Sequence, residues 1–327
     1  MAYTKMFSEE VWTKVNEDSK ALLDDYVLEL EANGKAAKTI EQYVYDIKAF
    51  YCYIAEHGNN KYILDLKKRD FRNFFLGMSK NGTSSARINR LQSSIRNELQ
   101  FCENDDDLYE DYETNQMRKL KGLPKESVRD IVFLSDDQVT GLINYLIEHE
   151  QYQKALYVSL SYDSAGRRNE VYQVLKDGFE TSNQTNEVIG KRSKKFKLIY
   201  FNRTREIAKL WLEQRGEDNI DSLWVVGKGE AKRPATYTTL YGWTLSFRTI
   251  LKKLYDEDIE LNPHSFRHSA LENYGQGTHN TLKELGKKEL PLNVLKVIAH
   301  HSDISTTQGY LANHDDELLE DAFGTEF

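Results

Sequence analysis

Apolar residues recur at helical spacing through the first hundred residues of the chain. They follow an i, i+3, i+4, i+7 pattern in four successive stretches, which predicts four amphipathic helices. Thr39 and Gln42 form a capping-box pattern at the start of the second stretch, and Ser84 or Ser85 stands at the N-cap of the fourth. We expect residues 1–106 to form a helical domain.

The pattern changes after this region. Residues 107–130 are acidic, contain tyrosines and lack apolar periodicity, which predicts a linker. Residues 131–327 return to helical spacing, interrupted by two short β-rich runs at 186–192 and 194–201. These runs predict a hairpin with Lys191 in its turn. The expected fold is mainly α with a small β-sheet insertion, that is, α+β.

Length and composition set broad limits on the class of protein. A chain of 327 residues with 39% hydrophobic residues is long enough for two packed domains. It contains neither 18 consecutive apolar residues nor the apolar core of a signal peptide, so we expect a cytoplasmic protein with no membrane partner. Cys52 and Cys102 have no metal-ligand spacing, and we expect two reduced, packed thiols.

Charge is unevenly distributed along the chain. The net charge is −8, but thirteen of the 52 acidic residues lie in residues 103–113 and 315–327, so the remainder has 44 basic and 39 acidic residues. Residues 71–97 and 188–205 contain no acidic residue. Such runs are typical of solvated surfaces, but two of them in two domains favour contacts to DNA phosphates. The predicted DNA-binding residues are Lys80, Arg87, Arg90, Arg96, Arg192, Lys194 and Lys195.

The last quarter of the chain holds the strongest candidate chemistry. Asn262 and Pro263 form the N-cap and first position of a predicted helix, so His264 and Arg267 share one of its faces. This face directs a proton-transfer group and a permanent cation toward one place. Tyr310 lies early in a later predicted helix.

Four segments carry a resemblance to a known family: SAGRRNEV at 164–171, GKRSKK at 190–195, HSFRH at 264–268 and HSDISTTQGY at 301–310. In this order they resemble the signature segments of the tyrosine recombinases, the phage integrase family. The N-terminal helices resemble that family's core-binding domain. The resemblance covers nearly the whole chain and implies a core-binding domain followed by a tyrosine-recombinase catalytic domain.

Matched position by position, the resemblance implies six catalytic residues: Arg167, Lys191, His264, Arg267, His301 and Tyr310. Their chemistry suits transfer of a DNA phosphodiester to a tyrosine through a 3′-phosphotyrosine. The two guanidiniums clamp the phosphate, and His264 accepts the proton of the Tyr310 phenol, whose ordinary pKa is about 10. Lys191 protonates the departing 5′ oxygen, His301 binds the phosphate, and no cofactor or metal is implied.

The expected partner is double-stranded DNA with a specific site, bound near the nucleoid by dimers or tetramers that exchange strands through a Holliday junction. The acidic tail 315–327 is expected to pack on a neighbouring protomer through Leu318, Leu319, Phe323 and Phe327, and a frayed tail is the alternative.

Three other functions stay open from the sequence. The first is a transcriptional regulator, such as a prophage repressor, that has the recombinase fold and performs no strand exchange. The second is a topoisomerase or telomere resolvase with the same phosphotyrosine chemistry. The third is a metal site at His264 with His268, or at His300 with His301, although Ser265 stands where a zincin has glutamate.

The chain departs from the family pattern at three places. Ala165 and His300 stand where the family usually has glycine, which predicts strain in tight backbone turns. The segment 275–291 is longer than the usual spacing before the last histidine and predicts a loop or an extra turn.

Overall fold

The computed structural model describes residues 7–124, 131–179 and 183–300, and the chain divides into two units, Met1–Asp130 and Ile131–Phe327. Each unit has its own hydrophobic core. The predicted positions His301 and Tyr310 and the tail 315–327 lie outside the described residues.

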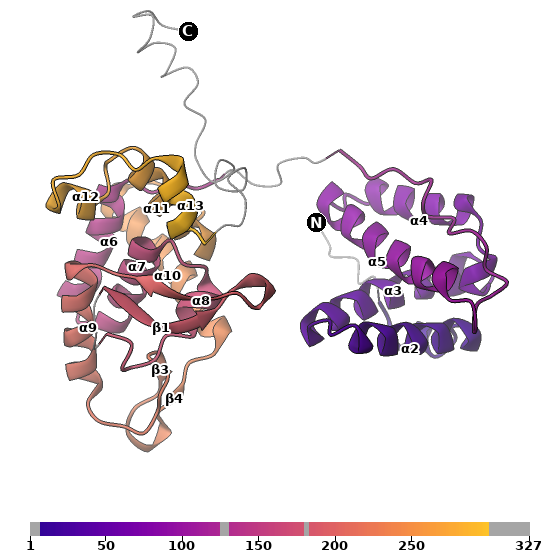
Figure 1. Ribbon diagram of the computed structural model, residues 1–327, viewed down its shortest axis with the longest axis horizontal. Helices are drawn as coiled ribbons and strands as arrows, with labels where there is room; N and C mark the ends of the chain where they lie inside the picture. Colours follow the sequence, from indigo (N-terminus) through magenta and orange to yellow (C-terminus); the bar gives the residue numbers. More distant parts are fainter. Residues whose placement is uncertain (1–6, 125–130, 180–182, 301–327) are drawn as a thin grey trace, which may run out of the picture. The chain divides into compact units, whose positions relative to one another are not determined.

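The first unit is built from helices (Figure 1), and their apolar residues form one buried core. Leu22, Ile47, Phe50, Phe71 and Ile95 have no exposed surface. The four predicted amphipathic helices are therefore confirmed. The described elements are α1 (Glu9–Trp12), α2 (Glu17–Ala32), α3 (Ala37–His57), the 3-10 turn η1 (Ile63–Asp65), α4 (Lys68–Lys80) and α5 (Ser85–Asn104).

Local hydrogen bonds decide where these helices begin. The Ser84 side chain accepts a hydrogen bond from the backbone N–H of Arg87 and caps α5, as predicted. The capping box predicted at Thr39 is wrong, because α3 begins earlier, at Ala37. The side chain of Gln42 instead donates to Asp46, 3.2 Å away.

The segment after α5 packs against the first unit. Tyr109 and Tyr112 lie against its core, and Met117 is fully buried there. The Asn89 side chain accepts from the backbone N–H of Leu123 at 2.7 Å and donates to the carbonyl of the same residue at 2.9 Å. The described part of the predicted linker, residues 107–124, is therefore packed on the first unit, because the tyrosines between the acidic residues cover apolar surface.

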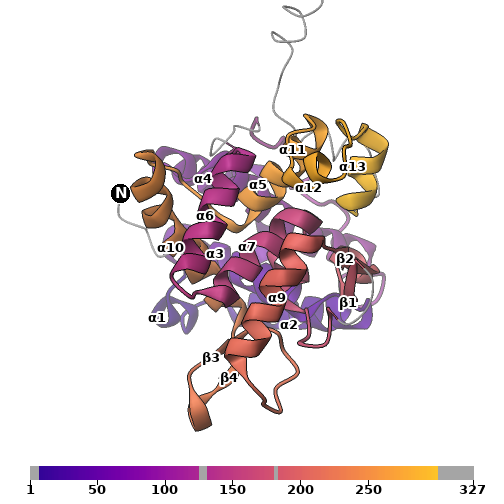
Figure 2. The same cartoon turned by 90° about the vertical axis from the view of Figure 1, so that its left-hand side faces the viewer.

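In the second unit, helix α7 is buried among other helices. Its residues from Ala155 to Ser164 are all buried. Figure 2 shows α7 between α6 and α9, and α11 also packs on it. The elements are α6 (Asp136–Glu148), α7 (Tyr152–Ser164), α8 (Arg168–Tyr172), β1 (Gln184–Ile189), η2 (Lys191–Ser193), β2 (Lys195–Ile199), α9 (Asn202–Arg215), β3 (Val225–Val226), η3 (Gly229–Ala231), β4 (Arg233–Pro234), α10 (Tyr237–Tyr255), α11 (Pro263–Gly275), α12 (Asn280–Glu284) and α13 (Leu292–Ile298).

Antiparallel pairs supply the β structure of the described residues. Strands β1 and β2 form the predicted hairpin, with Val188 opposite Phe196 and Ile189 opposite Lys195. The short pair β3 and β4 was not predicted. The α+β class with a small β insertion is confirmed. None of the helices in the described ranges is long and apolar enough to span a membrane.

The segment 275–291 contains a further helical turn. Its start is fixed by the carbonyl of Asn273, which accepts from the backbone N–H groups of Thr278 and His279. Helix α12 follows, and the backbone N–H of Leu290 then donates to the carbonyl of Tyr274. The segment therefore returns to α11 before α13 begins.

Candidate active site

A tight turn between α7 and α8 presents Arg167. Ala165 ends α7 in the left-handed region, with φ 47°. A Cβ on Gly166 would lie 2.8 Å from the hydroxyl of Ser164, so this turn leaves no room for a larger residue there. Arg167 then caps α8 with its side chain 25% exposed. The turn thus directs this arginine to the surface of the unit.

Glu170 orients Arg167. Its carboxylate accepts from the Arg167 guanidinium at 2.8 Å and from the Arg167 backbone N–H at 2.7 Å. The Glu170 side chain is 1% exposed. The buried carboxylate therefore fixes both the start of α8 and the direction of the guanidinium.

Arg267 lies at the junction of three segments. It is fully buried on α11, and its guanidinium donates to the carbonyl of Ala165 and, at 2.6 Å, to that of Ala299. It therefore joins the turn that bears Arg167 to the end of α13. These bonds place permanent positive charge beneath that turn.

His264 occupies the first turn of α11. The Asn262 side chain accepts from the His264 backbone N–H at 2.9 Å, which confirms the predicted N-cap. The residue is exposed at the surface of the unit. Its pKa is lowered, first by desolvation and then by the positive charges of Arg267 and Arg167, with Glu170 acting in the opposite direction. The neutral imidazole is therefore favoured at neutral pH.

The β1–β2 hairpin carries Lys191. The backbone N–H of Gly190 donates to the carbonyl of Lys194 and closes the loop. Lys191, Lys194 and Lys195 are all exposed, and Lys195 also pairs with Glu187 at 3.3 Å. Arg192 belongs to η2, and its side chain lies outside the described atoms.

His300 links this hairpin to α13. Its ring stacks on Phe196 of β2, with centroids 3.7 Å apart and planes at 22°. Burial is the main cause that lowers its pKa to about 4. Its backbone is left-handed, with φ 52°, so His300 and Ala165 both adopt the conformation that favours glycine. The two departures from the family pattern therefore coincide with special backbone positions.

The predicted DNA contacts of the first unit have different surroundings. Arg87 and Arg90 pair with the buried carboxylate of Asp46 at 2.9 and 3.1 Å, with side chains 20% and 42% exposed. Arg96 donates to the carbonyls of Met117 and Leu120, at 3.4 and 3.0 Å. Lys80 is exposed at the end of α4. Arg96 therefore holds the segment after α5 in place, whereas Arg90 and Lys80 remain accessible.

Two residues of this site were not predicted, although both lie near the recognised segments. Glu170 follows Arg167 by three residues, which is a capping spacing. Asp163 is buried, and its carboxylate accepts from the backbone N–H of Phe201 at 3.0 Å and from the hydroxyl of Thr204 at 2.5 Å. Desolvation raises the pKa of Asp163 to about 6. It connects α7 to the chain leaving β2, a contact that no local pattern signals.

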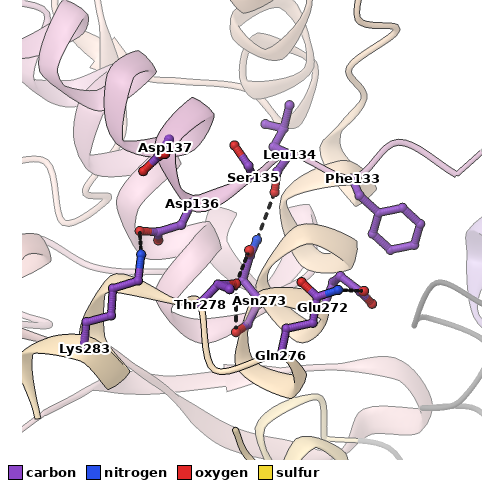
Figure 3. Close-up of a pocket in the computed structure, with 10 residues that line it drawn as sticks. All are labelled: Phe133, Leu134, Ser135, Asp136, Asp137, Glu272, Asn273, Gln276, Thr278 and Lys283. Atoms are coloured by element: carbon purple, nitrogen blue, oxygen red, sulfur yellow. Dashed lines mark hydrogen bonds and ion pairs between the residues drawn. The ribbon is translucent and has the colours of Figure 1, made fainter. Parts of the chain in front are cut away.

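A pocket of about 380 Å³ lies elsewhere in the second unit, between the start of α6 and the end of α11 (Figure 3). Lys283 points to Asp136 at 3.5 Å, and the Asn273 side chain donates to the carbonyl of Leu134 at 2.9 Å. Among the described catalytic candidates, Arg167, Lys191, His264 and Arg267 do not line it. Its polar groups bind one another and hold α6, α11 and α12 together.

Metal binding finds no support in the described ranges. They contain no group of three histidine, cysteine, aspartate or glutamate side chains able to hold an ion. His268 instead contacts the ring of Phe133 edge-on, with centroids 6.0 Å apart.

Known proteins resemble this chain over most of its length. A relative from Bacillus subtilis (strain 168), the SPbeta prophage-derived recombinase-like protein YomM, is 25% identical over 92% of this chain and 89% of its own length. The tyrosine recombinase XerA of Pyrococcus horikoshii is 24% identical over 90% and 89%.

Solved structures share the fold. A lambda integrase dimer bound to a COC′ core site matches with a TM-score of 0.67 at 14% identity, over 89% of this chain and 94% of that one. XerH recombinase bound to palindromic difH matches with a TM-score of 0.66 at 16% identity, over 89% and 80%. The description "Phage integrase, N-terminal SAM-like domain" matches residues 23–104, and "Phage integrase family" matches residues 132–317. Because the second match alone spans more than half of the sequence, the chain belongs to the phage integrase family.

Proposed function

We propose that this protein is a site-specific DNA recombinase that cleaves and rejoins DNA through a phosphodiester bond to Tyr310. The observation that carries the proposal is the junction made by Arg267. Its hydrogen bonds to Ala165 and Ala299 bring together three segments that are far apart in the sequence. Those segments bear Arg167, His264 and the residue that precedes His301.

The arginines neutralise the phosphate. Arg167 is partly exposed and oriented by Glu170, so its guanidinium is available to grip non-bridging oxygens. Arg267 is buried, and its fixed charge stabilises the pentavalent transition state from beneath. His301 adds a hydrogen bond to the same phosphate.

Proton transfer is divided between two residues. The Tyr310 oxygen forms a bond to phosphorus as its phenolic proton passes to neutral His264. The bond from phosphorus to the 5′ oxygen breaks, and the Lys191 ammonium gives that oxygen a proton. Rejoining reverses both transfers with another 5′ hydroxyl, and the covalent phosphotyrosine conserves the bond energy between the two steps.

Exposed cations on both units bind the DNA backbone. Lys80 and Arg90 contribute from the first unit, and Lys194 and Lys195 extend the contact from the hairpin. Strand exchange requires several protomers on one site, so self-association accompanies DNA binding, as the lambda integrase dimer on its core site illustrates. Action on chromosomal DNA places the protein at the nucleoid.

The test uses covalent capture. DNA that remains attached to the protein after denaturation is recovered from host cells and sequenced, for the wild type and for Tyr310→Phe. We expect adducts at one or two loci that disappear in the variant. Nicked duplexes made from those loci then trap the same adduct in vitro, because the short cleaved strand diffuses away.

A different outcome would identify another function. If crosslinked protein occupies several loci and no adduct forms on nicked duplexes, the chain is a DNA-binding regulator with a recombinase fold. An adduct that persists in Tyr310→Phe would exclude Tyr310 as the nucleophile.

A further inference from the structure

Helix α8 is flanked by Arg167 at its N-cap and by Gln173 at its C-cap, and Gln173 contacts the hairpin. Its N-terminal end bears Arg167, and Gln173 follows at its C-cap, six residues later. Figure 1 shows α8 beside β1, whose last residue, Ile189, lies two residues before Lys191. One short helix therefore lies close to two of the six proposed catalytic residues.

The Gln173 side chain grips the end of β1. Its amide nitrogen donates to the carbonyl of Ile189 at 2.9 Å, and its amide oxygen accepts from the backbone N–H of Ile189 at 3.0 Å. The same nitrogen also donates to the carbonyl of Asn169 at 2.8 Å. The primary amide thus pairs with both backbone groups of one residue, as a neighbouring strand would.

A second amide makes the reciprocal contact. The Asn186 side chain on β1 accepts from the backbone N–H of Leu175 at 2.9 Å and donates to the carbonyl of Gln173 at 3.3 Å. β1 is therefore docked on the end of α8 at two points. The Gln173 contact is the one adjacent to the loop, whereas Asn186 lies five residues before Lys191.

Gly190, the residue after β1, is closely packed at the base of the loop. A Cβ on Gly190 would lie 2.6 Å from the Phe196 ring and 3.2 Å from the Glu170 carboxylate, so the loop base sits directly over α8. The loop itself exposes Lys191, whose flexible side chain has no fixed direction of its own. Its reach is set by where the backbone of Gly190 is held.

We propose that Gln173 is a positioning residue that holds the Lys191 ammonium where it protonates the departing 5′ oxygen. This inference rests on the proposed function, because it assumes that Lys191 is the general acid. In this role Gln173 acts on the backbone at the base of the loop and not on the DNA or the reacting atoms. It acts through the backbone of Ile189, so its loss should impair only the step that needs the Lys191 proton.

The leaving group provides a specific readout. When the bridging 5′ oxygen is replaced by sulfur, the bond from phosphorus to sulfur breaks and a thiolate departs. A thiolate is a stable anion near neutral pH and needs no proton from a general acid. A defect confined to Lys191 should therefore disappear on the sulfur substrate, and a general loss of site structure should persist.

The experiment compares cleavage of two nicked duplexes that carry the recovered site, one with 5′ oxygen and one with 5′ sulfur. We expect Gln173→Ala to slow adduct formation on the oxygen duplex by about 10- to 100-fold, and Lys191→Ala by about 100-fold or more. Both variants should approach the wild-type rate on the sulfur duplex. Gln173→Glu places an acceptor-only carboxylate against the carbonyls of Ile189 and Asn169, so its defect on the oxygen duplex should be at least as large as that of Gln173→Ala.

Gln214→Ala is the matched control, because the Gln214 amide donates to a backbone carbonyl, that of Glu150, away from the hairpin. It should cleave both duplexes at the wild-type rate. The inference is overturned if Gln173→Ala cleaves the oxygen duplex normally, or if it is slowed equally on both duplexes. A wild type that forms no Tyr310-dependent adduct on either duplex would overturn the proposed function and this inference together.

Discussion

Glu98 makes the stability of the first unit depend on pH. It is fully buried on α5, where its carboxylate accepts from the Tyr51 hydroxyl at 2.8 Å. Its second oxygen has no hydrogen-bond partner among the described residues. Desolvation raises its pKa from the ordinary 4.5 to about 8, with the Tyr51 hydrogen bond acting in the opposite direction.

The sign of the effect follows from proton uptake. Between about pH 4.5 and pH 8 the folded unit holds a proton on Glu98 that the unfolded chain releases. The free energy of unfolding therefore falls as pH rises through this window, by up to about 1.4 kcal/mol per pH unit. The accumulated loss is about 1 kcal/mol at pH 5.5 and about 3 kcal/mol at pH 7.

Glu98→Gln removes this ionisation and keeps the acceptor for Tyr51. The new amide N–H groups replace a buried oxygen that has no hydrogen-bond partner among the described residues, and burying them unpaired costs about 1–3 kcal/mol at every pH. The free energy of unfolding of the variant, relative to the wild type, should therefore increase by about 2 kcal/mol between pH 5.5 and pH 7. With a urea dependence of about 2 kcal/mol per molar, this is a relative midpoint shift of about 1 M.

Cysteine labelling measures this unit selectively. Both cysteines of the chain, Cys52 and Cys102, are buried in the first unit. A short pulse of thiol reagent after equilibration in urea, read by mass spectrometry, therefore reports unfolding of this unit alone. Glu41→Gln, at an exposed position on α3, is the control, because it makes the same substitution outside the core. A Glu98→Gln difference that is equal at both pH values would refute the reasoning.

Three further predictions concern the site and the DNA surface. Gly190→Ala should slow adduct formation by about 10-fold or more with unchanged DNA affinity, because the new Cβ would meet Phe196 and Glu170. Normal cleavage of nicked duplexes by this variant would contradict the close packing at Gly190. The pKa of His264 is lowered from 6.5 in the protein without DNA, so the acid limb of kcat/KM for cleavage, which reports the free protein, should have its midpoint below that value, and a midpoint above it would contradict His264 as the base. Arg90→Ala should weaken DNA binding and reduce the salt slope by about one unit, whereas Arg96→Ala should mainly destabilise the first unit. Anisotropy titrations at several salt concentrations measure DNA binding, and thiol labelling measures the stability of the first unit. The prediction is contradicted if Arg96→Ala reduces the salt slope and Arg90→Ala destabilises the first unit.

The sequence predicted the features that depend on near neighbours. Ser84 caps α5, and Asn262 with Pro263 begins α11, as expected. The hairpin forms with Lys191 in its turn. A cap or a two-strand turn is decided by hydrogen bonds within a few residues, so its pattern is visible in a short stretch of sequence.

Charge patterns alone do not show what surrounds each basic residue. Arg90 and Arg96 belong to the same acid-free run, yet the exposed Arg90 pairs with the buried carboxylate of Asp46, and Arg96 donates to two backbone carbonyls. The partner of each lies tens of residues away in the chain. A basic run therefore indicates that cations are present but does not say which of them packing engages.

The sequence by itself determined the order of the chemical segments, the helical periodicity and the local caps, because each is written in adjacent residues. Only the tertiary structure decided that Arg267 is buried between Ala165 and Ala299, that the acidic segment packs on the first unit, and that Gln173 holds the hairpin. These contacts join residues separated by 16 to 102 positions. Their existence depends on which buried polar groups meet once the two cores form, since each such group must find a partner when water is excluded.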